Sequence, residues 1–209
     1  MTLDGMNDSL PIVNANEPSS FCEVEIDDFV ALVLAGGEVA ADGLRNRVLN
    51  AVQIAFLREN KCLLGVAGLK RPSANHRRDV ARGSKTALDA EALPFELGWV
   101  FILPSARNRK LSFPLCRPLV EAALGKGIFA TSRSDNAGMH NTLGKLGFVR
   151  VGSEWPSQQN NGNLVLFLKH AVYPLARADA GDSVPCFLTL LWPAPHSQAV
   201  GQLLNKGKY

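Results

Sequence analysis

The sequence predicts a mixed α/β or α+β domain, in which helices cover the faces of a central sheet. Two patterns support this class: apolar runs of strand length recur along the chain, and segments with helical spacing of apolar residues lie between them. The composition agrees, since 46% of the 209 residues are hydrophobic and 20% are charged, as in globular proteins. The net charge of +3 is too small to indicate a nucleic-acid-binding protein by itself.

The first third of the chain combines polar and periodic segments. Residues 1–20 are rich in Asn, Ser, Asp and Pro, which predicts a poorly ordered leader. Residues 21–26 alternate between apolar and polar side chains and predict a strand. Two helices follow, one capped by Asp27 or Asp28 and ended by glycines, the other capped by Asp42.

A hairpin and a long loop occupy the next part. Residues 53–58 and 62–69 are apolar runs of strand length, and the polar residues between them suit a tight turn. Residues 70–93 have no clear period and many charges, which predicts a long surface loop with at most one helical turn.

The second half alternates between strands and helices. We expect strands at 95–103, 128–133, 148–151 and 164–168, and helices at 112–124 and 137–146. The main domain is therefore expected to span residues 21–169. Residues 170–209 form an extension in which 186–192 predicts one further strand, apolar enough to pair with a sheet edge and to make a homodimer.

The cysteines and the first residues of the chain indicate whether a metal site is expected and in which compartment the protein is expected. Cys22, Cys62, Cys116 and Cys186 lie far apart without a CxxC pair, which argues against a zinc ribbon or a thioredoxin-type site, and we expect no metal. The N-terminus is acidic and polar rather than signal-like, and no apolar stretch approaches the ~20 residues of a membrane span. We expect a soluble, cytoplasmic protein with reduced thiols that does not bind membranes.

A basic loop at residues 104–112 joins a predicted strand to a predicted helix. Free N–H groups at the start of a helix favour a phosphate, and Arg107, Arg109 and Lys110 add positive charge. Taken alone, this pattern is more typical of a solvated loop that binds nothing, because charged loops between strands and helices are common.

The surrounding spacing resembles the acyl-CoA-binding core of the GNAT superfamily of N-acetyltransferases. The residues that carry the first motif are Glu96, Val100, Ile102, Pro104, Arg107, Lys110 and Ser112. The second motif is Asn136, followed by an apolar helix and Gly147-Phe148. The upstream helix pair and hairpin also fit, so the resemblance covers roughly residues 21–169.

The resemblance implies acetyl-CoA as co-substrate, bound in a V-shaped opening between parallel strands at 95–103 and 128–133. Backbone groups near Val100, Phe101 and Ile102 would pair with the pantetheine arm. The implied pyrophosphate-binding amides are those of Arg107, Asn108, Arg109, Lys110, Leu111, Ser112 and Phe113. Asn136 would contact the pantetheine, and an amine would attack the thioester carbonyl.

Three positions depart from the family pattern. Lys110 and Ser112 replace a glycine and a small residue, although glycine lets backbone approach phosphate closely. Leu143 occupies the position where the family often has a Tyr that protonates the departing thiolate. The general acid is therefore absent or supplied from elsewhere.

Three residues are candidates for the chemistry. Glu96 is the candidate base, a role that requires burial to raise its pKa; the alternative is a solvated glutamate. Ser132, or its neighbour Ser134, could hydrogen-bond the thiol or the acetyl oxygen. His140 could donate a proton to the thiolate if it faces the cleft; the alternative is a surface histidine. Cys116 lacks any signal of an activated thiol and is expected in the core.

The sequence thus predicts an N-acetyltransferase that uses a ternary complex and a small-molecule or peptide amine. Residues 70–85 hold six basic residues and one acidic residue, so a lid for an acidic acceptor, or action on nucleic acid or aminoacyl-tRNA, is a second interpretation. No aromatic residues lie between these basic ones to stack on bases. A third interpretation is a non-catalytic module that binds acyl-CoA.

Overall fold

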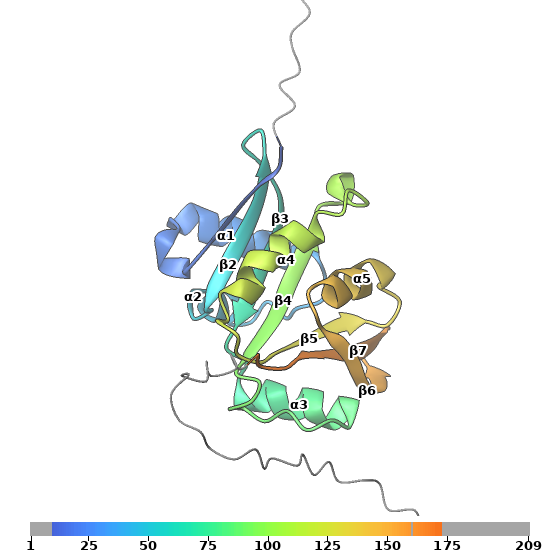
Figure 1. Ribbon diagram of the computed structural model, residues 1–209. Helices are drawn as coiled ribbons and strands as arrows, with labels where there is room; N and C mark the ends of the chain where they lie inside the picture. The colour runs from blue at the N-terminus through green and yellow to red at the C-terminus, as the bar shows by residue number, and fades with distance from the viewer. Residues whose placement is uncertain (1–9, 160, 173–209) are drawn as a thin grey trace, which may run out of the picture. The chain divides into compact units, whose positions relative to one another are not determined.

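The computed structural model describes residues 10–159 and 161–172 (Figure 1). In this part of the chain the strands form one seven-stranded sheet in the order β1-β2-β3-β4-β5-β7-β6. The strands are β1 (Ile12–Asn16), β2 (Gln53–Glu59), β3 (Cys62–Lys70), β4 (Phe95–Ile102), β5 (Ile128–Arg133), β6 (Val149–Pro156) and β7 (Asn163–Lys169). The helices are α1 (Glu23–Ala35), α2 (Leu44–Leu49), α3 (Ala74–Ser84), α4 (Ser112–Glu121) and α5 (Ala137–Lys145).

The sheet is mixed, and its parallel pair is short. Among the paired strands described, β4 and β5 run parallel, whereas every other neighbouring pair is antiparallel. The register joins Phe95, Glu96 and Leu97 of β4 to Ile128, Phe129 and Ala130 of β5. β4 continues to Ile102 alongside β3, so the two parallel strands separate after this three-residue stretch. The predicted fold class, a helix-covered sheet splayed between two parallel strands, is confirmed.

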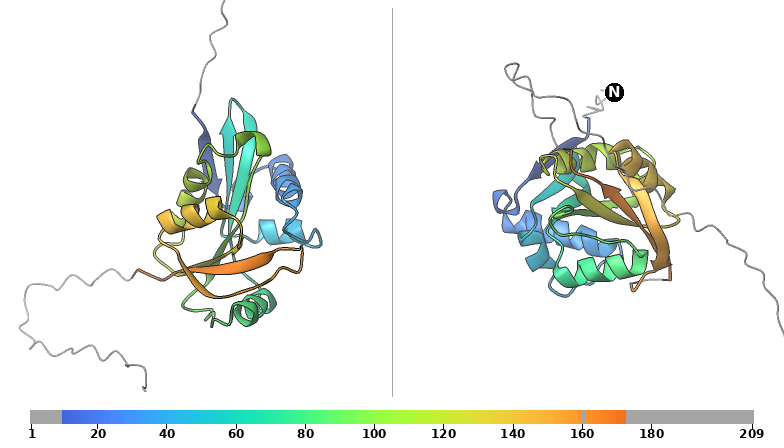
Figure 2. Two further views of the ribbon diagram at one scale, coloured as in Figure 1. Left: turned by 90° about the vertical axis from the view of Figure 1, so that its right-hand side faces the viewer. Right: turned by 60° about the horizontal axis from the view of Figure 1, so that its bottom comes forward.

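Helices cover both faces of the sheet (Figure 2). On one face, α4 packs against β2, β3 and β4 through Leu115, Cys116 and Leu119, and α5 lies beside it. On the other face, α1 and α2 cover β2 to β4. α3 closes the same face over Phe129 of β5 and over β7. Since alternate residues of a strand point to opposite faces, Glu96 points toward α3 while Leu97 enters the α4 core.

The strand predicted at residues 21–26 is wrong, because α1 begins there. Cys22 is the N-cap, and its backbone N–H donates to the Glu25 carboxylate at 3.1 Å. Ile26, Phe29 and Val33 then lie on one helix face in the core. Their spacing of three and four residues is that of one face of a helix.

The predicted leader also needs correction where the structure describes it. Ile12–Asn16 forms β1, an edge strand that pairs antiparallel with β2 and packs Val13 and Ala15 on the core. The polar residues of this segment lie on its other, exposed face. The predicted extension lies almost wholly outside the described residues, and so does its strand at 186–192.

The segment predicted as a long loop contains α3, which is 11 residues long. Ser73 caps the helix by accepting a hydrogen bond from the backbone N–H of His76 at 3.2 Å. Gly83 lies inside the helix because a side chain there would meet the indole of Trp155 at 2.6 Å. The helix therefore owes its stability to a tertiary contact that local sequence does not encode.

Most of the remaining elements lie near the predicted positions, but α2 has Gly43 rather than Asp42 as its N-cap, and β6 continues to Pro156 instead of ending at 151. The tight turn between β2 and β3 contains Asn60 and Lys61, both with positive φ. β5 coincides with the predicted strand, and α4 begins at the predicted residue, Ser112, and continues through Pro118. No helix among the described residues is long and apolar enough to cross a membrane.

Candidate active site

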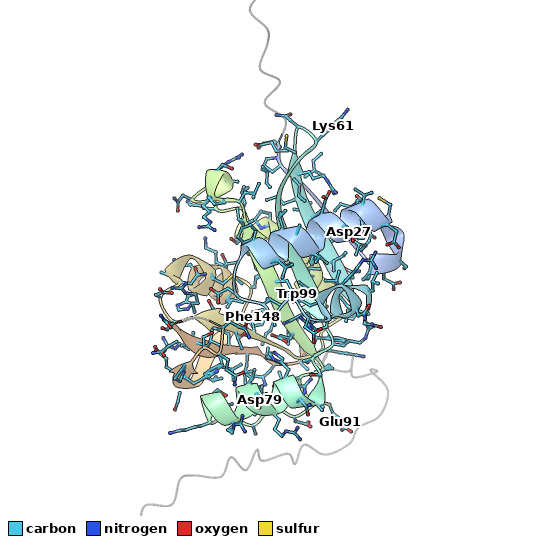
Figure 3. All side chains as sticks on the ribbon, turned by 180° about the vertical axis from the view of Figure 1, so that it is seen from behind. Asp27, Lys61, Asp79, Glu91, Trp99 and Phe148 are labelled. Carbon is cyan, nitrogen blue, oxygen red and sulfur yellow. The ribbon has the colours of Figure 1, made fainter. Side chains whose placement is uncertain are left out.

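A bulge in β4 opens the sheet. Trp99 has a φ of 53°, and the pairing of β3 with β4 shifts register between Val66 and Gly68. The indole of Trp99 is buried against Phe29 of α1, which holds this unfavourable backbone conformation in place. In Figure 3, Trp99 lies between α1 and α3, at the point where β4 leaves β5.

The opening is part of a large cleft of about 2050 Å³. Its walls include Glu96 to Ile102 of β4, the end of β5, the start of α5 and the loop before α4. The connection between α1 and α2, one side of α3, and residues 155–159 at the end of β6 also line it. Sites for single small molecules usually measure 300–1,000 Å³, so the cleft has room for two substrates.

The loop before α4 contains two residues with left-handed backbone conformations. Asn108 and Lys110 adopt left-handed conformations with φ of 64° and 59°. Alternation between left- and right-handed residues turns successive N–H groups toward one side. The loop leads into α4, whose first residues, Ser112 and Phe113, have no intrahelical partner for their N–H groups. Lys110 therefore occupies the conformation that favours the glycine of the family pattern, with its side chain exposed.

The three basic side chains of this loop have different surroundings. Arg109 forms a two-point ion pair with Glu59 of the hairpin, at 3.0 and 2.5 Å. The hydrogen bond from Arg109 lowers the pKa of Glu59, so this charge is engaged within the protein. Arg107 donates from Nε to the carbonyl of Ile102 at 3.1 Å. Arg107 and Lys110 both line the cleft and remain the cations best placed for a phosphate.

Glu96 is buried at the centre of the sheet, with 3% of its side chain exposed. Its Oε1 accepts from the Lys70 ammonium at 2.7 Å, and its Oε2 lies 3.0 Å from Nε2 of His76. Burial acts to raise the pKa of this carboxyl, but Lys70 and His76 outweigh it and lower the pKa to about 2. The raised pKa that a basic role required is therefore not found.

Lys70 is the neutralising partner of Glu96. The two residues lie opposite each other in the register of β3 and β4, and the ammonium also lies 5.3 Å from the centre of the Trp99 ring. Gly98 leaves room for it, because a Cβ at that position would meet Lys70 Cε at 2.8 Å. The sequence pattern predicts a surface loop that starts at Lys70, whereas in the structure Lys70 is the last residue of β3.

His76 is the residue that the sequence reasoning missed. It lies in the first turn of α3, and its ring stacks over Phe129 of β5 with centroids 6.5 Å apart. The ring is 44% exposed and lines the cleft. One sequence signal was present, since Pro72-Ser73 marks a helix start and places His76 in the first turn.

The other predicted residues divide between the cleft and its surroundings. Asn136 lines the cleft and caps α5, with its Oδ1 accepting from the Met139 N–H at 3.0 Å. This leaves the N–H groups of its side-chain amide as donors for a ligand. Ser132 also lines the cleft, and its hydroxyl lies 3.3 Å from the carbonyl of Arg133. Val100, Phe101 and Ile102 form the wall at the splayed end of β4.

Three side chains discussed in the sequence analysis do not line the cleft. His140 has Nε2 2.9 Å from the carbonyl of Arg133 and packs on Phe167 instead of lining the cleft. Its suggested role as proton donor depended on facing the cleft, so it is not retained. Leu143 is fully buried. Burial raises the pKa of the Cys116 thiol to about 12, which leaves it unreactive.

The described residues contain no group of three or more His, Cys, Asp or Glu that could hold a metal ion.

These features define a class of fold. A mixed sheet that opens between two parallel strands, with helices on both faces, is the fold of the GNAT acetyltransferases, and solved structures of that family share it with this chain. No sequence-family model matches the chain, and the comparison with curated proteins finds no similar sequence. The likeness is therefore one of structure.

Three of these structures illustrate the likeness. The putative acetyltransferase yncA of Salmonella typhimurium, solved with acetyl-CoA, is 17% identical, with a TM-score of 0.54 over 80% of this chain and 99% of that one. Escherichia coli ElaA is 12% identical, with a TM-score of 0.56 over 76% and 99%. The ribosomal-protein-S18-alanine N-acetyltransferase of Escherichia coli is 11% identical, with a TM-score of 0.53 over 79% and 98%.

Proposed function

We propose that the protein is an N-acetyltransferase that moves an acetyl group from acetyl-CoA to a primary amine in a ternary complex. One observation carries the proposal: the separated strands β4 and β5, the left-handed loop before α4 and the buried Glu96 carboxylate all face a single cleft. Such a cleft brings a phosphate-bearing thioester and an amine together at one point of the sheet.

The cofactor would enter through the splay of the sheet. Beyond Leu97 the edge of β4 that faces away from β3 has backbone groups available, and these would pair with the amide groups of the pantetheine arm. The N–H groups between Asn108 and Phe113 would hold the pyrophosphate, with charge from Arg107 and Lys110. The amide of Asn136 would reach the inner end of the arm.

The reaction would proceed by direct attack. The amine nitrogen would add to the thioester carbonyl carbon, and a backbone N–H of β4 would stabilise the resulting oxyanion. Collapse of this intermediate would break the carbon–sulfur bond and release the CoA thiolate. The amine must lose a proton during the transfer, and Glu96 is a buried carboxylate that lines the cleft. Ser132 would hydrogen-bond the thiol or the acetyl oxygen.

We propose a small molecule or a peptide as the amine acceptor. The basic segment at residues 70–85 gives weaker support to a nucleic acid, because most of its charge is engaged. Lys70 pairs with Glu96, Arg71 and Arg77 donate to backbone carbonyls, and Arg82 pairs with Asp79. Steep loss of RNA binding with added salt would favour the nucleic-acid alternative.

A transfer assay tests the proposal. Purified protein is mixed with acetyl-CoA and a panel of primary amines: a peptide with a free N-terminus, polylysine, spermidine and an aminoglycoside. Thiol release and the mass of the acetylated product are both measured. We expect turnover on at least one amine. Acetyl-CoA binding without turnover on any of them would identify a non-catalytic module instead, and absence of binding would refute the proposal.

A further inference from the structure

The charged side chains that line the cleft are not balanced. Eight Lys and Arg side chains but only four Asp and Glu side chains line it. All four acids are paired with three of the cations: Glu38 and Asp135 with Arg133, Asp79 with Arg82, and Glu96 with Lys70. Five cations therefore line the cleft without a carboxylate partner in the described part of the chain.

These five cations lie on two sides of the cleft. Arg107 and Lys110 belong to the loop before α4, and Lys145 is the last residue of α5. In the proposed function this side takes CoA, whose phosphates supply matching negative charge. Arg47 of α2, and Arg71 directly after β3, lie on the side left for the acceptor. Two cations on the acceptor side are thus balanced neither by a protein carboxylate nor by a CoA phosphate.

Arg71 is held in place by the backbone that follows α2. Its Nη1 donates to the carbonyls of Asn50 and Ala51 at 3.1 and 2.9 Å, directly after the helix ends at Leu49. The carbonyls at the end of a helix lack intrahelical donors, so this contact also stabilises α2. Because a carbonyl orients a guanidinium without cancelling its charge, Arg71 remains an exposed cation in a fixed position.

One edge of the Arg71 guanidinium remains available for a ligand. Arginine has five N–H donors, and Nε and Nη2 of Arg71 have no acceptor among the described residues. The same edge of Arg133 shows what these two nitrogens bind, since its Nε and Nη2 donate to the two oxygens of Asp135 at 3.0 and 2.6 Å. Two parallel N–H groups match a carboxylate in both geometry and charge.

Arg47 contributes charge to the same side of the cleft. Its Nη1 and Nη2 donate to the carbonyls of Asp42 and Ala40 at 2.6 and 2.8 Å, which fixes the connection between α1 and α2. These contacts use both terminal nitrogens, so Arg47 is less suited than Arg71 to a two-point contact. Its positive charge still adds to the potential that attracts an anion to this side.

Building on the proposed function, we infer that the acceptor is a small amine that also carries a carboxylate, as a free amino acid does, and that Arg71 binds this carboxylate. The two carboxylate oxygens would accept from Nε and Nη2 of Arg71. Arg71 directly follows Lys70, which pairs with Glu96 of β4, so this contact adjoins the strand where transfer is proposed. A polycation would meet like charge here and would find the acidic side chains already paired.

A cycle that changes both partners tests the inference. Free amino acids are compared with their carboxamides, which have the same amine without the carboxylate, in the wild type and in Arg71→Gln. Taking the ratio between the two acceptors within each protein cancels the difference in amine basicity. We expect Arg71→Gln to raise the KM for the preferred amino acid about tenfold or more, and that for its carboxamide less than about twofold.

Two further variants sharpen this test. Arg78→Gln is the matched control, because Arg78 is an exposed arginine of α3 outside the cleft lining, and it should leave both KM values unchanged. Arg71→Lys keeps the charge but loses the paired N–H groups, so its KM should lie between those of the wild type and Arg71→Gln. Calorimetry should give all of these proteins the same affinity for acetyl-CoA, which checks that the fold is retained.

The possible failures are distinguishable. Equal effects of Arg71→Gln on the amino acid and on its carboxamide would mean that Arg71 only supports α2, and would overturn the inference. Transfer to spermidine or polylysine in preference to every amino acid would overturn it as well. Both results would leave the proposed acetyl transfer intact. Wild type that binds no acetyl-CoA would refute the proposed function together with the inference.

Discussion

The ionised state of Glu96 makes a measurable contribution to stability, and acidification removes it. The pKa of this carboxyl falls from 4.5 to about 2 on folding. A carboxyl whose pKa is lower in the folded state stabilises the protein above its unfolded pKa and loses this contribution as pH falls toward the folded pKa. The window is therefore pH 4.5 down to about 2. At ~1.4 kcal/mol per pKa unit, the full contribution is about 3 kcal/mol, of which about 2 kcal/mol is lost between pH 5 and pH 3.

Urea unfolding at pH 5 and pH 3 measures this contribution. Other acidic groups titrate in the same range, so the wild type is compared with Glu96→Gln, which keeps all of them. We expect the wild type to lose about 2 kcal/mol more than the variant between the two pH values. At pH 5 the variant should itself be less stable, because it leaves the mostly buried ammonium of Lys70 without its carboxylate. Equal losses in the two proteins would refute the assignment of a strongly stabilised, ionised Glu96.

Three further predictions concern neighbouring positions. In Gly98→Ala the new Cβ would meet Lys70 Cε at 2.8 Å and should push the ammonium away from Glu96. Because Lys70 lowers the pKa of Glu96, acid unfolding of this variant should begin at a higher pH than that of the wild type in the same urea experiment. Lys110→Gly should be about 1 kcal/mol more stable than Lys110→Ala in chemical denaturation, because φ at this position is 59° and alanine resists the left-handed conformation. A double-mutant cycle on Arg109 and Glu59 should give only a small coupling, because both side chains are partly exposed. A large coupling would mean that the loop is held more rigidly than a surface ion pair allows.

Much of the fold could be predicted from local pattern. The β2–β3 hairpin, β5 and α5 have long apolar runs or clear helical spacing, and each lies where it was expected. α1 was misread in its first turn, because Cys22 to Ile26 alternates in sequence yet follows a capping box. Short alternating runs fit both a strand and a helix start, and burial against the sheet decides between them.

The candidate site was predicted only in part, for a physical reason. Glu96 and the loop before α4 belong to one continuous stretch of chain, so their spacing is visible in the sequence. His76 and Lys70 reach the carboxylate from other elements. Their arrangement depends on α3, a largely polar helix that is fixed by Trp155 packing on Gly83. The environment that lowers the pKa of Glu96 is thus a product of tertiary structure.

Calorimetric titration with acetyl-CoA tests the central claim most directly. The wild type is compared with Arg107→Ala, which removes a cation from the cleft wall, and with Arg117→Ala as control, since Arg117 pairs with Glu121 on α4 outside the cleft lining. The account predicts one site of micromolar affinity that Arg107→Ala weakens about tenfold and Arg117→Ala leaves unchanged. No heat of binding in the wild type, or equal affinity in all three proteins, would contradict the assignment of this cleft to acetyl-CoA.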